Sequence, residues 1–469
     1  MTRSTHAFTD DALGTHDAVG LAAEIDAGRV SPTEAVEAAL ARADAVNGEI
    51  NAIVTPTVDR AQAMASSGTA GVLAGVPTYI KDTDAIEGVP NRFGSRAMPD
   101  TPAAESSPLV VQYESTGVIP LGSSTLPEFG LTATTEPLLT GITRNPWSLD
   151  HSTGGSSGGS AALVAAGVVP IAHANDGGGS IRIPAANCGL VGLKPTRERI
   201  RQAELPKILP LNIGVQGVVS RSVRDTALFM HGAEQHFHHP GLPAVEHVAT
   251  PLDRPLRIGL FTTDAAGVTF DSRSVAETER IGRLCESLGH RVEPIDNPFP
   301  ASFVDDFFVF WSLLPALMWR MGTRAFGEGF DREQLEPWTR YLAKYFTRHL
   351  ARLPGAVRRL RRFEADYSAT FTNCDVLLSP TLGRPVPEIG YFDTTIPGDV
   401  HMARARSHVP VTPFQNVSGG PAISLPLATD DRGLPLGIHF GADLGQEALL
   451  LELALQLEQA SPWKTLADV

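Results

Sequence analysis

The sequence predicts an α/β fold in which helices cover both faces of a central β-sheet. Two observations predict it. Short apolar segments typical of buried strands alternate along most of the chain with longer segments of helical period. Apolar residues make up 42% of the 469 residues, which suffices for a sizeable core and excludes a wholly disordered chain.

The N-terminal elements carry clear local signals. Ser31 precedes a proline, and Glu34 stands three residues after Ser31, which predicts a helix that begins with a capping box. Apolar residues then recur at helical spacing, so residues 16–47 are predicted to be helical. The segment 71–81 predicts a short buried strand, and residues 107–122 predict a helix followed by a second strand.

The alternation continues through the rest of the chain. A helix of small residues is predicted at 158–168, and the strand after it ends in a glycine run. Residues 256–295 predict a strand–helix–strand unit. The C-terminal part adds three strands and a closing helix, over 374–381, 421–427, 434–442 and 445–459.

Two stretches differ in character from their flanks. Residues 231–250 carry five histidines, and a surface loop is favoured there over a metal site. Residues 301–363 are aromatic and then basic, which predicts a helical insertion over the core. The basic helix expected at 340–363 is interpreted as a solvated face paired with acidic neighbours, in preference to a nucleic-acid or membrane patch. The aromatic residues of this insertion fit a packed core and the border of an apolar pocket equally well: Phe303, Phe307, Phe308, Phe310, Trp311, Trp319 and Trp338.

Charge and composition exclude several classes of protein. The net charge of −14 argues against a nucleic-acid binder, which needs a basic stripe. The three cysteines are far apart, so a disulfide framework is not expected. The N-terminus lacks the apolar segment of a signal peptide, and the longest apolar stretches fall short of the roughly 20 residues of a membrane span. We therefore expect a cytoplasmic protein with no nucleic-acid or membrane partner.

The segment 152–196 carries the densest chemical signal. Runs of glycine let backbone N–H groups converge on developing negative charge, and a serine that closes such a run suits acyl transfer. Serine is a weak nucleophile and needs a base. The two glycine-rich turns of this segment are Gly154-Gly155-Ser156-Ser157-Gly158-Gly159 and Asp176-Gly177-Gly178-Gly179-Ser180.

Three residues are candidates for that base. Lys81 follows an apolar strand, and a buried lysine loses its charge readily enough to act as a neutral base. His173 lies in a predicted buried strand, where a hydrogen-bonded core histidine is the favoured interpretation, and His151 is expected at the surface. GSSGG also fits a nucleophile elbow centred on Ser157. An elbow requires a strand before the turn, and the sequence of the preceding TRNPWSLDHST does not favour a strand.

Eight groups of short motifs follow one another along most of the chain. They are GVPTYIKD (75–82), PEF and TRNPW (127–147), GGSSGGS (154–160), NDGGGSIRIPAA (175–186), CGLVGLKPT (188–196), RSVRD (221–225), FQNVSGGPAISLP (414–426) and GLPLGIHF (433–440). With these motifs the chain resembles the amidase signature family over most of its length. Within the family, its motifs are similar to those of bacterial nylon-oligomer hydrolases of the 6-aminohexanoate cyclic dimer hydrolase type. The resemblance implies one large α/β domain over 1–469 with a mixed central sheet. A catalytic core is expected at about 60–235 and 370–469, and a variable helical cap at about 300–365.

The resemblance also implies a Ser–cisSer–Lys triad. Ser180 is the implied nucleophile, Ser156 the bridging residue after a cis peptide bond from Gly155, and Lys81 the base. The 24 residues from Ser156 to Ser180 match the family separation. The other implied site residues are the oxyanion-hole amides of Gly177, Gly178, Gly179 and Ser180, the supporting pair Asp176 and Arg182, and the acyl-pocket residues Gly130 and Leu131.

The implied activity is hydrolysis of an amide bond through an acyl-enzyme, with no metal or organic cofactor. The implied substrates are small aryl or alkyl amides, oligoamides or carbamates, and a homodimer is left open. The alternative is the glutamine-hydrolysing A subunit of a tRNA-dependent amidotransferase. The chain departs from that subunit in RIPAA after Ser180 and in residues 197–214, so a stand-alone amidase is preferred.

Overall fold

A mixed eight-stranded sheet forms the centre of the computed structural model, which describes residues 3–202 and 209–469. The segment 197–214 is therefore described only in part. Three neighbouring strands at one edge run parallel, and the other pairs in the sheet are antiparallel. The α/β prediction with a mixed sheet is confirmed. Across the sheet the strands are β10 (Arg291–Pro294), β9 (Arg257–Leu260), β11 (Val376–Pro380), β13 (Pro435–Gly441), β12 (Ala422–Thr429), β7 (Val191–Lys194), β8 (Val215–Ser220) and β6 (Ile171–Asp176).

A second, three-stranded sheet lies beside β6. It is formed by β1 (Ile53–Pro56), β3 (Ile119–Ser124) and β2 (Pro77–Lys81) in that order. The Thr78 hydroxyl donates to the Ile171 carbonyl at 2.9 Å, and the Lys81 N–H donates to His173 Nδ1 at 3.1 Å. These bonds hold β2 alongside β6, so that Lys81 at the end of β2 lies near the end of β6, where the glycine run begins.

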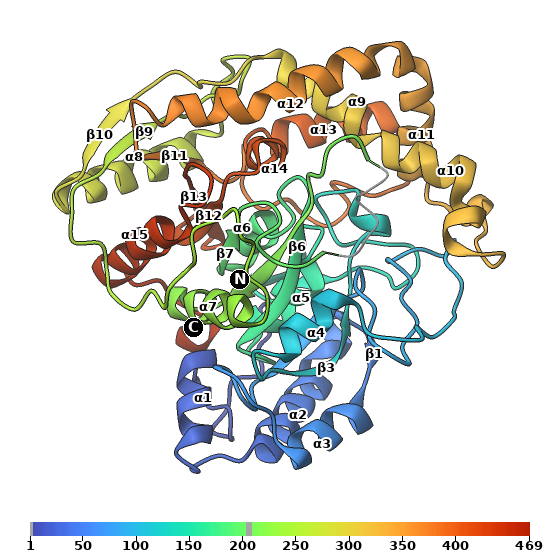
Figure 1. Ribbon diagram of the computed structural model, residues 1–469, viewed down its shortest axis with the longest axis vertical. Coiled ribbons are helices and arrows are strands. Elements are labelled where there is room, and N and C mark those ends of the chain that lie inside the picture. Colours follow the sequence, from blue (N-terminus) through green and yellow to red (C-terminus); the bar gives the residue numbers. More distant parts are fainter. Residues whose placement is uncertain (1–2, 203–208) are drawn as a thin grey trace.

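Helices surround the two sheets (Figure 1). α1 to α3 lie at one end of the molecule and α9 to α12 at the opposite end. The capping box of Ser31 and Glu34 is present at the start of α2. The helices are α1 (Ala18–Asp26), α2 (Pro32–Ile50), α3 (Val58–Ser67), α4 (Pro108–Glu114), α5 (Gly158–Ala165), α6 (Arg182–Cys188), α7 (Val223–His236), α8 (Ser272–Ser287), α9 (Ser302–Trp311), α10 (Leu313–Phe326), α11 (Pro337–His349), α12 (Leu353–Thr370), α13 (Gly398–His408), α14 (Pro413–Ser418) and α15 (Glu447–Ala460).

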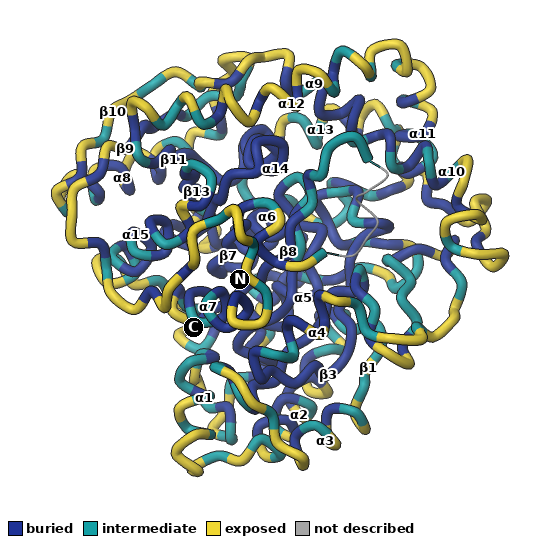
Figure 2. The backbone as a smooth tube through the Cα atoms, viewed as in Figure 1, coloured by how far each residue is buried: buried dark blue, intermediate teal, exposed yellow. Residues whose placement is uncertain are grey.

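Both faces of the large sheet are covered. Successive residues of a strand point to opposite faces. On β13, His439 contacts Arg182 of α6, whereas the neighbouring Phe440 pairs in register with Leu378 of β11, which lies against Gly282 of α8. Figure 2 shows most strands of the large sheet buried between these layers, with the edge strand β10 and the outer helices exposed.

The aromatic insertion is helical and builds a hydrophobic cluster of its own. Phe303, Phe307 and Phe310 of α9 are buried in it together with Phe363 of α12 and Phe414 of α14. One helical stretch, Ser302–Phe326, is long and apolar enough by length and composition to cross a membrane, and 56% of its most apolar window is buried inside the protein.

Three details of the sequence interpretation are wrong. TRNPWSLDHST does form strands, the hairpin of β4 (Arg144–Asn145) and β5 (Ser148–Ser152), because backbone pairing there does not depend on an apolar pattern. The basic segment 340–363 is two helices, α11 and α12, joined by a 3₁₀ turn. The histidine-rich stretch starts inside α7, which extends to His236.

The interpretation of the basic segment as a paired surface holds for three of its arginines, of which Arg340 lies 4.0 Å from Glu333. Arg359 of α12 is ion-paired with Asp306 at 2.6 Å, and Arg352 lies 3.4 Å from Asp305. Both carboxylates belong to α9, so these contacts fasten α12 against the aromatic helix. The three cysteines are buried and free, as expected.

Candidate active site

Lys81 ends β2 in a fully buried position. Its Nζ lies 2.7 Å from Ser156 Oγ, 2.9 Å from Ser157 Oγ and 2.5 Å from Asn175 Oδ1. Burial lowers the pKa of Lys81 to about 7, against the opposing effect of the Asp176 and Asp84 carboxylates. A large fraction of this amine is therefore neutral near pH 7.

The two glycine-rich turns meet at this lysine. Ser156 follows a cis peptide bond from Gly155, as the resemblance implied, and precedes α5. Ser180 stands between the end of β6 and the start of α6. Ser156 and Ser180 line one cavity, so the structure brings all three expected triad residues into one place.

The second turn is held by the carboxylate of Asp176. Asp176 Oδ1 accepts from the Gly179 N–H at 2.6 Å, and Oδ2 accepts from the Ile181 N–H at 3.2 Å. Gly179 has φ +132°, and a Cβ there would overlap Thr412, so only glycine fits. Because its N–H is bonded to Asp176, Gly179 cannot serve the oxyanion role expected of it without giving up that bond. The amides of Gly177, Gly178 and Ser180 remain for that role.

Arg182 and Asp176, the supporting pair that the resemblance implied, form a buried ion pair. Two bonds of 3.0 Å join the guanidinium to the carboxylate, from Nε to Oδ2 and from Nη2 to Oδ1. Burial would raise the pKa of Asp176, but the charge and hydrogen bonds of Arg182 outweigh it and lower the pKa to about 2. Arg182 also reaches α14 and the segment before it, through Gln415, Thr412 and Asn416.

Replacing this arginine is expected to destabilise the whole fold. Arg182→Met should lower the free energy of unfolding by about 3–5 kcal/mol, because the Asp176 carboxylate stays buried without its partner. Urea denaturation followed by circular dichroism measures the change. Arg29→Met, which removes an exposed pair with Glu24, is the control and should cost less than about 1 kcal/mol. Equal losses in the two variants would contradict the assigned role.

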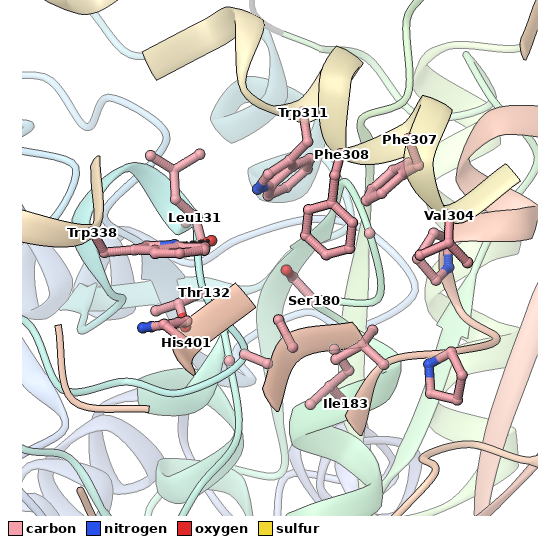
Figure 3. Close-up of a pocket in the computed structure, with 18 of the residues that line it drawn as sticks. Leu131, Thr132, Ser180, Ile183, Val304, Phe307, Phe308, Trp311, Trp338 and His401 are labelled. Atoms are coloured by element: carbon pink, nitrogen blue, oxygen red, sulfur yellow. Dashed lines mark hydrogen bonds between the residues drawn. The ribbon is translucent and has the colours of Figure 1, made fainter. Parts of the chain in front are cut away.

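Two cavities meet at Ser180. The first has an empty volume of about 650 Å³, and none of the residues that line it within 3–202 and 209–469 is Asp, Glu, Lys or Arg. Figure 3 shows Ser180 pointing into it between Ile183 and the side chains of Phe308 and Trp311 from α9. Trp338 stacks on His401 with ring centroids 3.9 Å apart and forms another wall. Burial lowers the pKa of His401 to about 4, so this ring is neutral at pH 7.

The second cavity is larger, with an empty volume of about 1230 Å³. One part of its lining is polar and includes Asn175, Asn212 and Gln216, while Phe310 and Trp311 belong to its apolar part. Gly130 and Leu131, the residues that the resemblance placed in the acyl pocket, line both cavities. All seven aromatic residues left open between core and pocket pack in the aromatic cluster, and six of them also line a cavity. Phe303, Phe307, Phe308, Trp311 and Trp338 line the first cavity, Phe310 lines the second, and Trp319 lines neither.

The histidine candidates for the base have other partners. His173 Nδ1 accepts from the Lys81 N–H, its Nε2 lies 2.9 Å from Gln216 Oε1, and burial lowers its pKa to about 3. His173 is therefore a hydrogen-bonded core histidine, which is the interpretation that the sequence favoured. His151 is buried, contrary to the expectation of a surface position, because Ser148 and Arg432 enclose it with contacts of 2.8 and 2.9 Å.

Sequence reasoning missed two residues at the site. Asn175 and Ser157 contact the Lys81 amine directly. Ser157 lines neither cavity, which argues against a nucleophile elbow centred on it. The sequence signals for Ser157 were its place in the first glycine-rich turn and the elbow pattern, and the signal for Asn175 was its position directly before the second turn. Within residues 3–202 and 209–469, no group of three or more His, Cys, Asp or Glu side chains is placed to hold a metal ion.

Comparison with known proteins gives consistent matches. The sequence model of the family described as Amidase matches residues 34–451. AmiC of Mycobacterium leprae, whose name gives an amidase class and no substrate, is 47% identical over 463 residues and 98% of each chain. The 6-aminohexanoate-cyclic-dimer hydrolase of Pseudomonas sp. strain NK87 is 34% identical over 478 residues, which cover 95% of each chain. A solved structure of 6-aminohexanoate cyclic dimer hydrolase complexed with substrate aligns with a TM-score of 0.86 and 32% identity, covering 97% of this chain and 98% of that one.

These matches confirm the resemblance that the sequence motifs carried, including the likeness to nylon-oligomer hydrolases. The alternative of an amidotransferase A subunit is not favoured by them. The chain is a hydrolase of carbon–nitrogen bonds in amides other than peptide bonds. With a family match over most of its length, it belongs to the amidase signature family.

Proposed function

We propose that this amidase cleaves small neutral amides, oligoamides or carbamates through an acyl-enzyme on Ser180, with Ser156 and Lys81 relaying the proton. The observation that carries the proposal is the buried contact of 2.7 Å between Lys81 Nζ and Ser156 Oγ. No metal or organic cofactor enters the reaction as proposed.

The directions of the hydrogen bonds around Lys81 support its role as base. Asn175 Oδ1 has no proton and can only accept. The Ser157 hydroxyl lies 3.2 Å from the Asn175 carbonyl, to which it donates, so its oxygen accepts from Lys81. A neutral amine has two N–H groups and one lone pair. With both N–H groups used in this way, the lone pair of Lys81 faces Ser156 and can accept its proton.

The reaction then follows from these positions. Ser180 Oγ bonds to the substrate carbonyl carbon while its proton passes to Ser156 and the Ser156 proton passes to Lys81. The negative oxygen of the tetrahedral intermediate lies on the amides of Gly177, Gly178 and Ser180. Its collapse breaks the C–N bond, and the proton returns through Ser156 to the leaving nitrogen. Water attacks the acyl-enzyme by the same relay and regenerates Ser180.

The lining of the first cavity favours a neutral, apolar group on the substrate. Its walls are aromatic and aliphatic, and burying an unpaired charge there would cost several kcal/mol. A relative that shares 34% of its residues is named for a cyclic oligoamide, which also lacks charge. We further propose that the enzyme acts in the cytoplasm on small molecules and needs no nucleic acid or membrane.

A substrate panel tests this assignment. Nitroanilides, aliphatic amides, a cyclic oligoamide and an aryl carbamate are compared with glutamine, which carries an ammonium and a carboxylate. We expect kcat/KM for the best neutral substrate to exceed that for glutamine by at least about 100-fold, because the described residues that line the first cavity include no Asp, Glu, Lys or Arg to pair with a charged group. A preference for glutamine would overturn the proposal. Release of the amine and acid products, followed by chromatography, provides the readout.

A further inference from the structure

A chain of hydrogen bonds leads from Lys81 away from the two serines. Lys81 Nζ donates to Asn175 Oδ1, and Asn175 Nδ2 donates to Thr83 Oγ1 at 2.8 Å. The Thr83 hydroxyl donates to Asp84 Oδ2 at 2.9 Å. Asp84 lies three residues after Lys81, and its side chain is only 1% exposed.

The carboxylate at the end of this chain fixes the direction of every bond in it. An ionised carboxylate only accepts, so Thr83 must give its single proton to Asp84. Thr83 Oγ1 then accepts from the Asn175 amide nitrogen, which leaves the Asn175 oxygen facing Lys81. A reversed amide would place an N–H group against the Lys81 amine and compete with Ser156 for its lone pair.

The charged and titratable groups around the chain come from three elements. Asp84 follows β2, Asp176 and His173 belong to β6, and Tyr113 belongs to α4 and packs on the His173 ring. His173 Nε2 lies 4.0 Å from Asp84 Oδ2, but the low pKa of His173 keeps it neutral. Burial raises the pKa of Asp84 to about 6, against its bond from Thr83 and the charge of Lys81. Asp84 is therefore largely ionised above pH 6.

We propose that Asn175, Thr83 and Asp84 are positioning residues that hold the Lys81 amine with its lone pair toward Ser156. This inference rests on the proposed function of Lys81 as the base. It adds that the charge of Asp84 helps set the pH at which the enzyme becomes active, because a nearby anion stabilises protonated Lys81.

Thr83 allows a matched test. Thr83→Val keeps the shape of the side chain and removes the hydroxyl, whereas Thr83→Ser keeps the hydroxyl. We expect kcat on a neutral anilide to fall at least tenfold in the valine variant and to stay within about twofold of the parent in the serine variant. If Thr83 served only to shape the cavity, its replacement would change KM instead of kcat. Equal kcat values for the parent and the valine variant, or an equal loss in both variants, would overturn the proposal.

The pH profile of activity provides a second test, in which the direction of each shift is predicted. Activity of a neutral base rises with pH through the pKa of that base. Asp84→Asn removes a negative charge and should move this rise to lower pH, whereas Asn175→Asp adds one beside Lys81 and should move it to higher pH, each by at least half a pH unit. General damage to the fold cannot give opposite shifts. Circular dichroism checks that both variants are folded. If the rise in activity of the folded variants does not shift, or shifts in the same direction in both, the proposal is overturned.

These outcomes are separable from a failure of the proposed function. If Ser180→Ala remains active, the acyl-enzyme assignment has failed and the positioning role fails with it. If Ser180→Ala is inactive but Thr83→Val behaves as the parent, only the positioning role has failed.

Discussion

Ser180→Ala is expected to reduce turnover of every amide substrate by on the order of 10⁴-fold or more, the scale found when one member of a serine hydrolase triad is removed. Ser180 faces both cavities and closes the turn that carries the proposed oxyanion amides. The alanine variant keeps the Asp176–Arg182 pair and the glycine turn, so it should fold with unchanged stability.

Trapping the acyl-enzyme locates the nucleophile directly. A slowly hydrolysed aryl carbamate is mixed with the enzyme, the reaction is quenched with acid, and the intact mass is measured. The parent should gain one carbamoyl group and Ser180→Ala none.

Ser157→Ala is the matched control, since it removes a hydroxyl that contacts Lys81 but lines neither cavity. It should still be carbamoylated. A carbamoyl group found on Ser157, or on Ser180→Ala, would contradict the assignment.

Local signals explain what could be predicted from the sequence. The capping box of α2 involves neighbours in the chain, and the parallel strands β9 and β10 flank one helix. Lys81, Ser156 and Ser180 were found because they stand in motifs whose order and spacing match a family. The buried pair of Asp176 and Arg182 lies within six residues of chain.

Contacts between distant segments explain most of what was missed. Asn175 meets Lys81 only because β2 and β6 end side by side, 94 residues apart in sequence. His151 is buried by Arg432, which comes from the far end of the chain. The strand β5 is polar, so its pairing with β4 leaves no periodic apolar pattern to detect. The Gly179 amide is engaged by Asp176, a turn geometry that a run of three glycines does not specify.

Lys81→Arg is expected to be as inactive as Lys81→Met, with both losing on the order of 10⁴-fold in kcat/KM. A guanidinium keeps the positive charge and the donors, but its pKa is too high to give the neutral form that accepts a proton from Ser156. If Lys81 acted only as a fixed cation, the arginine variant would keep much of the activity and the methionine variant would not. Comparing the two therefore separates a base from an electrostatic role.

The pH dependence of the parent enzyme also tests whether Lys81 is the base. Burial lowers the pKa of Lys81 to about 7 in the free enzyme, so kcat/KM should rise as pH increases through about 7 and then level off. The Lys81→Met variant lacks this titrating amine. Its residual activity should therefore increase with hydroxide concentration without levelling off near neutral pH. Rates measured from pH 5 to 9 on a neutral anilide check both curves. A parent profile that falls as pH rises through 7 would show that the protonated lysine is the active form, and would exclude Lys81 as the base.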